Sequence, residues 1–281
     1  MRLGVIVLWV GIILSIGWGA DLQYDYLKEA SLSEMGASIL KNPAMINNET
    51  AQFSISRQDK LNALWQGNSL YVSLPSSQWN FGVFGHYDVI SNIAKTSQAN
   101  NGTFQADSTF SHMKAGVVLT LGTTLGSDLT IGVNSKLYYQ RLEERTCFNA
   151  GWDVGFQYNV LQNWKLGLSV NDLGGTSFRW SDNVVDTIAT NMNCGVSFQG
   201  KDFSTGYLYR SIDQSSRVSA SYRLYDTIEA SVTLPIENPY LAKLSLNVHF
   251  SPIKIGCEIG SDESVGQSAS FHFSFDIGEP S

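Results

Sequence analysis

The chain has 281 residues, a net charge of −7 and a sequence pI near 5.0. Hydrophobic residues make up 43% of it and charged residues only 15%, against roughly 25% charged residues in an ordinary soluble domain. Lys and Arg are scattered along the chain, which argues against nucleic acid as a partner. Beyond the N-terminal apolar run, no stretch is long enough for a transmembrane helix. The apolar residues must therefore be buried on alternate positions of strands.

The N-terminus has the layout of a secretory signal peptide. Met1 and Arg2 precede an apolar run from Leu3 to Ile16, and small residues follow before Asp21. The short run and the small residues predict cleavage after Gly19 or Ala20, with an uncleaved anchor helix as the alternative. We therefore predict a signal peptide at residues 1–20 and a mature protein in the bacterial outer membrane.

Residues 21–50 form the second predicted segment. They lack the period-two alternation of a strand, and the spacing of Leu22, Tyr26, Leu27 and Ala30 predicts one or two helical turns. We expect this segment to be separate from residues 51–281, which carry the strand pattern.

From residue 51 onward, about fourteen segments alternate between apolar and polar residues. Phe148–Val160 is the clearest of them, because all its even-numbered positions are apolar. The pattern predicts an all-β, transmembrane antiparallel β-barrel, and an even strand count puts both chain ends on one side of the membrane. The predicted strands are Gln52–Ser56, Ser69–Leu74, Trp79–Asp88, His112–Gly122, Leu129–Gln140, Phe148–Val160, Trp164–Asn171, Met192–Gln199, Phe203–Arg210, Arg217–Leu224, Ile228–Leu234, Lys243–Phe250, Ile253–Gly260 and Phe271–Ile277.

The connections between these segments alternate in length. Short turns follow the even-numbered segments, and longer loops such as Arg57–Asn68 and Val89–Phe110 follow most of the odd-numbered ones. Short periplasmic turns and longer outer loops are typical of bacterial outer-membrane barrels. A periplasmic β-sandwich or a lipocalin-like barrel is the alternative, because alternation alone does not distinguish a buried face from a lipid-facing one.

Charged side chains favour the membrane barrel. A charge that faces lipid at mid-bilayer costs roughly 2–4 kcal/mol, whereas a hydrated lumen tolerates it. Both signs occur on the polar face, which fits an ion-paired lumen, a plugged lumen or an open pore. The residues predicted to face the lumen are Lys114, Lys136, Asp153, Lys165, Arg217, Arg223, Glu229, Lys243, Lys254, Glu258 and Asp276.

No pattern points to catalysis, to a metal or to a cofactor. The four histidines, at 86, 112, 249 and 272, fall on the predicted lumen face without the spacing of metal ligands. Cys147, Cys194 and Cys257 are odd in number and lack paired spacing. We therefore predict a non-enzymatic protein without cofactor or metal, surrounded by outer-membrane lipid.

Two stretches resemble the FadL-like outer-membrane proteins, in particular their PorV/PorQ branch. One is the small-residue motif Gly36-Ala37-Ser38, followed by Asn42-Pro43-Ala44 before the first strand. The other is Gly151–Gly174, which is similar to the family's hairpin of an Asp-x-Gly strand, a short turn and an Asn-x-Gly or Asp-Leu-Gly ending. The resemblance implies a plug formed by Gly36, Ala37, Asn42, Pro43 and Ala44. The spacer between the two motifs is shorter than is usual in the family, so we expect a reduced plug, with a plain turn into the first strand as the alternative.

The resemblance to PorV and PorQ implies an accessory role in protein secretion or surface attachment, because those proteins are associated with type IX secretion. Exposed apolar side chains in the predicted outer loops are the candidates for contact with secretion-system proteins. These are Leu64, Trp65, Phe178 and Trp180. The alternative is that these residues fold over the barrel mouth.

The wider FadL-like group implies a different function, a channel for uptake of hydrophobic small molecules. Such a channel needs an exit through the wall, and Gly82 and Gly85 in the third strand either permit a kink there or mark close packing. The predicted loop Val89–Phe110 lacks the amphipathic helix that would help to capture a ligand.

Overall fold

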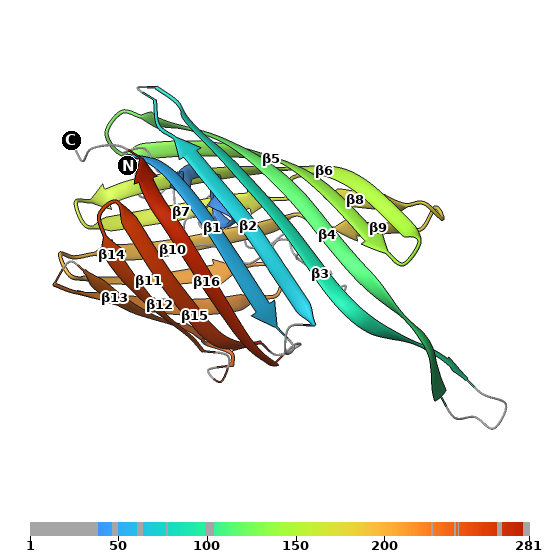
Figure 1. The fold of residues 1–281 in the computed structure, drawn as a ribbon. Helices are drawn as coiled ribbons and strands as arrows, with labels where there is room; N and C mark the ends of the chain where they lie inside the picture. Colours follow the sequence, from blue (N-terminus) through green and yellow to red (C-terminus); the bar gives the residue numbers. More distant parts are fainter. Residues whose placement is uncertain are drawn as a thin grey trace.

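The computed structural model describes residues 39–46, 50–60, 64–76, 78–98, 104–225, 227–238, 240, 242–262 and 266–277. This part of the chain consists mainly of β-strands (Figure 1). A short 3-10 helix, η1 (Pro43–Met45), precedes them. No helix among these residues is long and apolar enough to cross a membrane. The strands are β1 (Ala51–Lys60), β2 (Trp65–Leu74), β3 (Asn80–Gln98), β4 (Phe104–Leu125), β5 (Leu129–Leu142), β6 (Arg145–Leu161), β7 (Trp164–Asn171), β8 (Thr176–Trp180), β9 (Val185–Ile188), β10 (Asn191–Gln199), β11 (Phe203–Arg210), β12 (Ser215–Leu224), β13 (Ile228–Pro235), β14 (Lys243–Phe250), β15 (Ile253–Asp262) and β16 (Gly266–Ile277).

The strands form one antiparallel sheet that closes on itself. β1 pairs with β16, β5 pairs with β6, and β7 pairs with β10. β8 and β9 form a side hairpin that joins the wall at two residue pairs of β6, Cys147↔Trp180 and Phe148↔Arg179. Of the sixteen strands in the described chain, fourteen therefore make the barrel wall. The predicted all-β barrel of about fourteen strands is confirmed.

Side chains alternate between the two faces of the wall. On β5, Gly132, Asn134 and Lys136 are buried, whereas Val133 and Leu137 on the alternate positions are exposed. The exposed apolar side chains of the wall point outward, and the buried polar ones point into the barrel. This is the arrangement that a bilayer around the barrel requires.

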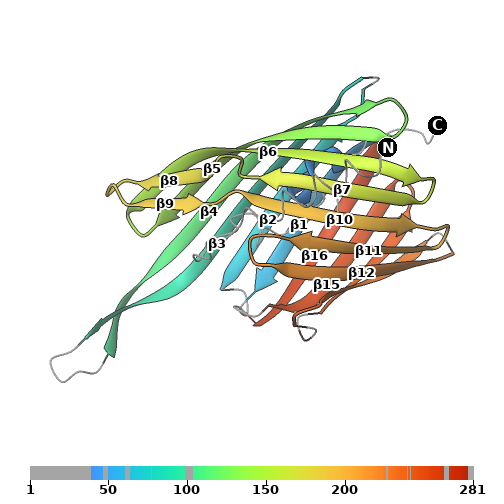
Figure 2. The ribbon, with the colours of Figure 1, turned by 180° about the vertical axis from the view of Figure 1, so that it is seen from behind.

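The wall is uneven in height. β3 and β4 have 19 and 22 residues, whereas β7, β11, β13 and β14 have 8 each. The β3–β4 hairpin projects beyond the other strands at the end of the barrel where β1 ends (Figure 1). The β8–β9 hairpin lies beside the ends of β5 and β6 at the turn that joins these two strands (Figure 2).

Much of the predicted loop Val89–Phe110 is strand, so this prediction was wrong. β3 continues to Gln98 and β4 starts at Phe104. The β3–β4 register shifts between Ile90 and Ile93 and again between Lys95 and Thr96. Each shift moves the following side chains to the other face, so the period-two pattern breaks while the backbone pairing continues. The predicted loop Arg57–Asn68 is also shorter than expected, because β1 extends to Lys60 and β2 starts at Trp65.

The wall is continuous at the two glycines of β3. Gly82 pairs with Ser73 and Thr120, and Gly85 pairs with Leu70 and Val117, so both neighbouring strands are held there. A Cβ at Gly82 would lie 3.1 Å from the Ile46 Cδ1 atom inside the barrel. Close packing, and not a gap in the wall, explains this glycine.

Candidate functional site

Residues 39–46, which we call the plug turn, lie inside the barrel (Figure 2). Helical residues 39–41 lead through Asn42 into η1, and Pro43, Ala44 and Ile46 are buried. Asn42 caps η1, because its Oδ1 atom accepts a hydrogen bond from the Ala44 N at 3.0 Å. Pro43 occupies the first helical position, where no backbone N–H is needed. The Asn-Pro-Ala motif is therefore a built turn that contacts β4, β5 and β6 from within.

Glycines of the wall allow the plug turn to approach the backbone closely. Gly122, Gly132 and Gly155 are direct neighbours across β4, β5 and β6, and we call this row the glycine seat. A Cβ at Gly155 would overlap the Asn42 Oδ1 atom, and one at Gly132 would overlap the Pro43 carbonyl group. At Gly122 it would lie 2.5 Å from the Ile46 Cγ2 atom. Any other residue at Gly132 or Gly155 would displace the plug turn, and one at Gly122 would displace the Ile46 side chain.

Polar side chains of the wall hydrogen-bond to the carbonyl groups at the end of the helical residues. Such carbonyls have no partner within a helix, and each costs about 1–3 kcal/mol if it is buried without one. The donors come from β5, β7 and β10, which are distant in sequence from the plug turn. The bonds are Asn134 Nδ2 to Ile39 O at 2.9 Å, Asn171 Nδ2 to Leu40 O at 2.8 Å, Ser169 Oγ to Lys41 O at 2.5 Å and Asn193 Nδ2 to Lys41 O at 3.3 Å. Asn42 adds a bond in the other direction, from its Nδ2 to the Phe156 O at 2.9 Å.

A buried ion cluster lies next to these donors. The Lys136 Nζ is 2.5 Å from the Asp153 Oδ1 and 2.8 Å from the Asp172 Oδ1. All three side chains are removed from solvent. The Asp153 Oδ2 accepts a hydrogen bond from the Asn134 Nδ2 at 3.0 Å, and the Asp172 Oδ1 accepts one from the Thr176 Oγ1 at 2.9 Å. Buried charges are tolerated only with such partners, so this cluster fixes β5, β6, β7 and β8 relative to one another.

The ion cluster also connects the β8–β9 hairpin to the plug turn. Thr176 begins β8, and Asn134, which bonds to Asp153, also donates to the Ile39 carbonyl. Gly151 makes room for the cluster, because a Cβ there would lie 2.6 Å from the Thr176 Oγ1. One continuous set of hydrogen bonds therefore runs from β8 to the plug turn. No group of three or more His, Cys, Asp or Glu side chains in the described ranges is placed to hold a metal ion.

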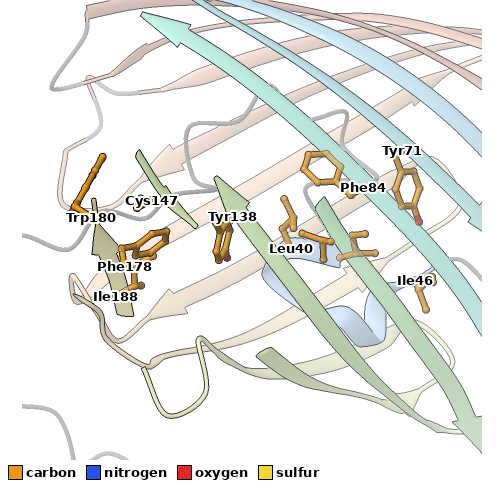
Figure 3. Packing of buried hydrophobic residues seen from close by; sticks show 11 residues of the cluster. Leu40, Ile46, Tyr71, Phe84, Tyr138, Cys147, Phe178, Trp180 and Ile188 are labelled. Atoms are coloured by element: carbon orange, nitrogen blue, oxygen red, sulfur yellow. The ribbon is translucent and has the colours of Figure 1, made fainter. Parts of the chain in front are cut away.

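Apolar side chains form a second connection along the same wall, which we call the apolar track. It runs from the β8–β9 hairpin past Tyr138 to the plug turn and the inner faces of β2, β3 and β4 (Figure 3). Tyr138 links the two ends, with its ring 5.6 Å from the ring of Phe178. The members are Trp180, Phe178, Ile188, Cys147, Tyr138, Ile39, Leu40, Ile46, Tyr71, Phe84 and Val118. The apolar track is thus a buried cluster among inward side chains that are otherwise mostly polar.

The predicted lumen residues fall into two groups. Lys114, Lys136 and Asp153 are buried on the inner face of β4, β5 and β6. The others lie on β7 and β12–β16, at Lys165, Arg217, Arg223, Glu229, Lys243, Lys254, Glu258 and Asp276. Besides Lys136–Asp153, the structure brings Arg223 to 3.5 Å from Glu229 and Lys243 to 3.3 Å from Glu258. The side chain of Asp276 lies outside the described residues, as do Gly36 and Ala37 of the predicted plug motif.

Three of the four predicted outer-loop contact residues are not exposed. Leu64 is 44% exposed at the β1–β2 turn, but Trp65, Phe178 and Trp180 are only 4%, 2% and 8% exposed. The prediction that these three are exposed was wrong, because they lie on strands and point inward. Trp65 lies under the Lys114 Nζ, 5.9 Å from its ring centroid, and the other two belong to the apolar track.

The sequence reasoning missed most partners of the plug turn. Asn171 and Asp172 lie within the stretch that resembles the family hairpin, so a signal for them was present. Asn134 and Asn193 lie outside that stretch and carry no motif, because only the strand register brings them to the plug turn. Gly122 and Gly132 likewise become neighbours of Gly155 only through pairing between strands.

Comparisons with known proteins identify a family and a shared fold. Residues 96–253 match a family model described as a family of unknown function (DUF5723). No curated protein matches the chain. Among solved structures, the Pseudomonas putida toluene transporter TodX is similar with a TM-score of 0.59 at 12% identity, over 88% of this chain and 95% of that one. The CymD monoaromatic hydrocarbon channel has a TM-score of 0.62 at 9% identity, over 94% and 96% of the two chains.

A Pseudomonas aeruginosa FadL homologue is also similar, with a TM-score of 0.54 at 10% identity, over 88% of this chain and 96% of that one. Identities this low establish a shared fold and nothing more about the ligand. The chain therefore has the fold of FadL-type barrels.

Proposed function

The chain belongs to DUF5723, a family of unknown function whose model covers residues 96–253, and we propose that it is an outer-membrane channel for hydrophobic small molecules. The observation that carries this proposal is the apolar track. Side chains inside a membrane barrel are usually polar, so a contiguous cluster of buried apolar side chains from the β8–β9 hairpin to the plug turn needs a reason. A hydrophobic solute supplies one, because apolar surface gains roughly 25 cal/mol per Å² when it leaves water.

The plug turn is the gate of the proposed channel. It packs between the glycine seat and the track residues Tyr71, Phe84 and Val118. Hydrogen bonds hold it on the side of β5, β7 and β10, and each contributes about 0.5–1.5 kcal/mol net. On the side that faces Phe84, the plug turn and the track residues contact each other through apolar side chains. A hydrophobic solute that replaces these apolar contacts would displace the plug turn at a lower free-energy cost than a solute that must break the hydrogen bonds.

The outer surface supports a place in the membrane. Large apolar side chains are exposed along the outward face of β2–β6 and β11–β15. Exposed aromatic rings lie near strand ends, where the two interfaces of a bilayer would be. These include Trp79, Tyr158, Trp164, Phe203 and Tyr222. Export through a signal peptide at residues 1–20 is part of this proposal and falls outside the described residues.

An accessory role in secretion is the weaker candidate. This role was predicted to use exposed apolar side chains in outer loops, but Trp65, Phe178 and Trp180 are buried. The similar solved structures include a toluene transporter and a hydrocarbon channel, whose names favour small-molecule passage. Both candidate functions, the channel and the accessory role in secretion, are non-enzymatic.

Uptake in a deletion strain tests the proposal. Cells that lack the gene should take up labelled toluene or a labelled fatty acid more slowly than cells that carry it, and a plasmid copy should restore the rate. Secreted and surface-attached proteins should remain the same in both strains. Unchanged uptake together with a loss of secreted proteins would reject the channel and favour the secretion role.

A further inference from the structure

Both ends of the β8–β9 hairpin are attached to Asp172, the residue that follows β7. At the start of β8, the Thr176 Oγ1 donates to the Asp172 Oδ1 at 2.9 Å. Just after β9, the Thr190 Oγ1 donates to the Asp172 O at 2.9 Å. Thr176 is 1% and Asp172 9% exposed, so the first of these bonds is buried. Asp172 is therefore the point at which the hairpin is fixed to the inside of the barrel.

The backbone of Asp172 adopts a conformation that is rare for a residue with a side chain. Its φ of 51° lies in the left-handed region, as do the φ angles of both glycines in the same turn, at 79° and 81°. Glycine adopts this region freely, whereas an aspartate does so at a steric cost that the surrounding contacts must offset. These contacts are the bond from Thr176, the ion pair with Lys136 at 2.8 Å and the bond from the Asp172 N to the Asp153 Oδ1 at 2.9 Å. Loss of the bond from Thr176 therefore favours a second conformation of this turn.

A direct route leads from Asp172 to the plug turn through the neighbouring residue. The Asn171 Nδ2 donates to the Leu40 O at 2.8 Å, so a movement of the backbone at Asp172 also moves this donor. The Asn171 Oδ1 accepts a bond from the Asn193 Nδ2 at 3.1 Å, and the same Nδ2 atom donates to the Lys41 O. Two carbonyl groups of the plug turn therefore depend on the position of Asn171.

A second route leads through the buried ion cluster. The Asp153 Oδ1 accepts from the Asp172 N, and the Asp153 Oδ2 accepts from the Asn134 Nδ2, which also donates to the Ile39 O. If Asp172 moves away, Asp153 loses a donor and Lys136 loses one of its two carboxylate partners. A buried charge that loses partners is costly, so the Asp153 carboxylate and the Asn134 amide must reorient together. That reorientation breaks the bond to the Ile39 carbonyl.

The inner face of the hairpin is apolar and belongs to the apolar track. Phe178 and Trp180 of β8 lie next to Tyr138 and Cys147 of the wall (Figure 3). A hydrophobic solute that inserts between hairpin and wall replaces these contacts with contacts of the same kind. The hairpin can then separate from the wall without exposing its apolar side chains to water.

We propose that the β8–β9 hairpin controls the plug turn: a hydrophobic solute that separates the hairpin from the wall releases Asp172, and the plug turn then loses its hydrogen bonds at Ile39 and Leu40. This inference rests on the proposed function, because it takes the plug turn as the gate of the channel. It adds an order of events, in which the hairpin end of the apolar track opens first and the plug turn follows. Coupling between two sites is reciprocal, so displacement of the plug turn must also loosen the hairpin.

Two substitutions of Thr176 test this coupling. The reporter is Ala44→Cys in the full-length protein with its native cysteines replaced by alanine, because Ala44 is buried and labelling by a water-soluble maleimide should be slow. Thr176→Val keeps the shape of the side chain but removes the hydroxyl group. It should raise the labelling rate about two- to twelvefold, the range that loss of one hydrogen bond represents. Thr176→Ser keeps the hydroxyl group and should label at the rate of the parent protein.

Thr187→Val is the matched control on the other strand of the hairpin. Thr187 is exposed on β9, opposite Ser177, and takes no part in the bonds described above. Its replacement should leave the labelling slow. Folding of every variant is checked by the slower migration of heated samples on a gel. Slow labelling in Thr176→Val, or an equal increase in Thr176→Ser or Thr187→Val, would overturn the coupling.

Hydrogen exchange measures the coupling in the reverse direction. Gly155→Val fills the space of the Asn42 Oδ1 atom and should make the backbone amides of 176–188 exchange faster. Gly85→Val should not, because a Cβ at Gly85 meets nothing within 4 Å. Equal exchange in these two variants would contradict the proposed control of the plug turn by the hairpin.

Uptake of labelled toluene, measured on the Thr176 variants, separates this inference from the proposed function. Faster labelling of Ala44→Cys with unchanged uptake would support the coupling and reject the plug turn as the gate. Slow labelling in Thr176→Val, in cells whose toluene uptake depends on the gene, would reject the coupling and leave the channel in place.

Discussion

Glycine at the seat positions sets how closely the plug turn lies against the wall. At Gly155 the first atom of any side chain would take the place of the Asn42 amide oxygen, which caps η1. The cap and the seat therefore depend on each other. The side-chain hydrogen bonds to residues 39–41 then fix the orientation of the turn.

Gly155→Val should dislodge the plug turn without breaking the wall, because β6 keeps its pairing while the space for Asn42 is lost. Ala44→Cys, in a chain whose native cysteines are replaced by alanine, reports the displacement through its rate of labelling by a water-soluble maleimide. Ala44 is buried, so labelling should be slow while Gly155 is kept. In the Gly155→Val variant the labelling rate should be at least about tenfold higher. That factor corresponds to a decrease of about 1.4 kcal/mol in the free energy needed to expose the labelled position.

Gly85→Val is the control for that experiment, since a Cβ at Gly85 meets nothing within 4 Å. It should leave the labelling of Ala44→Cys slow. Equal labelling rates in the Gly155 and Gly85 variants would show that the seat does not hold the plug turn.

Lys136 is the single cation of the buried ion cluster. Lys136→Met would leave the carboxylates of Asp153 and Asp172 buried without it, which should cost about 3–5 kcal/mol of unfolding free energy. Urea unfolding of the barrel in lipid vesicles measures this loss. Lys95→Met is the matched control, because the Lys95–Glu143 pair is exposed and such pairs contribute about 0–1 kcal/mol. A loss no larger than that of the control would mean that the cluster does not stabilise the barrel.

At the level of elements, the β8–β9 hairpin is held by side-chain packing more than by backbone pairing. It joins β6 through two residue pairs, whereas Phe178 and Trp180 are buried in the apolar track. Its position at the outer end of the track makes it the entrance of the proposed channel. Loosening it should therefore affect both local stability and uptake.

Phe178→Ala should open the hairpin, because loss of a buried Phe side chain costs about 3–5 kcal/mol. Hydrogen exchange of the backbone amides in 176–188 should become faster while the exchange of β12–β14 stays the same. Val185→Ala, on the exposed edge of β9, is the comparison variant and should change little. Similar exchange in both variants would argue that Phe178 does not anchor the hairpin.

The strands themselves were largely predictable from the sequence. Each of the predicted segments overlaps a strand of the wall, because one face of every such strand must be apolar. β8 and β9 were predicted as loop, since they have only 5 and 4 residues and follow Gly174 and Gly175. The β3–β4 hairpin was missed beyond Asp88 because its bulges break the alternation.

The site was less predictable than the strands. Asn42, Pro43 and Ala44 stand out as a motif, and the structure places them inside the barrel. Their partners Asn134 and Asn193 look like ordinary lumen residues in the sequence. Only closure of the barrel brings β5, β7 and β10 around one turn, and closure is a property of the whole sheet.

At the scale of the whole molecule, the barrel interior is divided into two sides. The apolar track and the plug turn lie on the side of β2–β6, whereas the inward positions of β12–β15 carry polar and charged side chains. The central claim is that the proposed channel for hydrophobic solutes opens only when the plug turn leaves the glycine seat.

Locking the plug turn to the wall tests that claim most directly. The Ile46 Cβ lies 3.9 Å from the position of a Cβ at Gly122, within the range of about 3.5–4.5 Å found in disulfides. The double variant Ile46→Cys and Gly122→Cys also removes the Ile46 Cγ2 that would meet the new side chain. It is made in the cysteine-free background, with Ile46→Cys alone as the control that cannot cross-link.

Uptake of labelled toluene is then measured in cells that carry the double variant, before and after oxidation and again after reduction. We expect uptake to stop when the disulfide forms and to return when it is reduced, with no redox effect in the control. If the cross-linked protein takes up toluene as fast as the reduced protein, the plug turn is not the gate and the central claim is wrong.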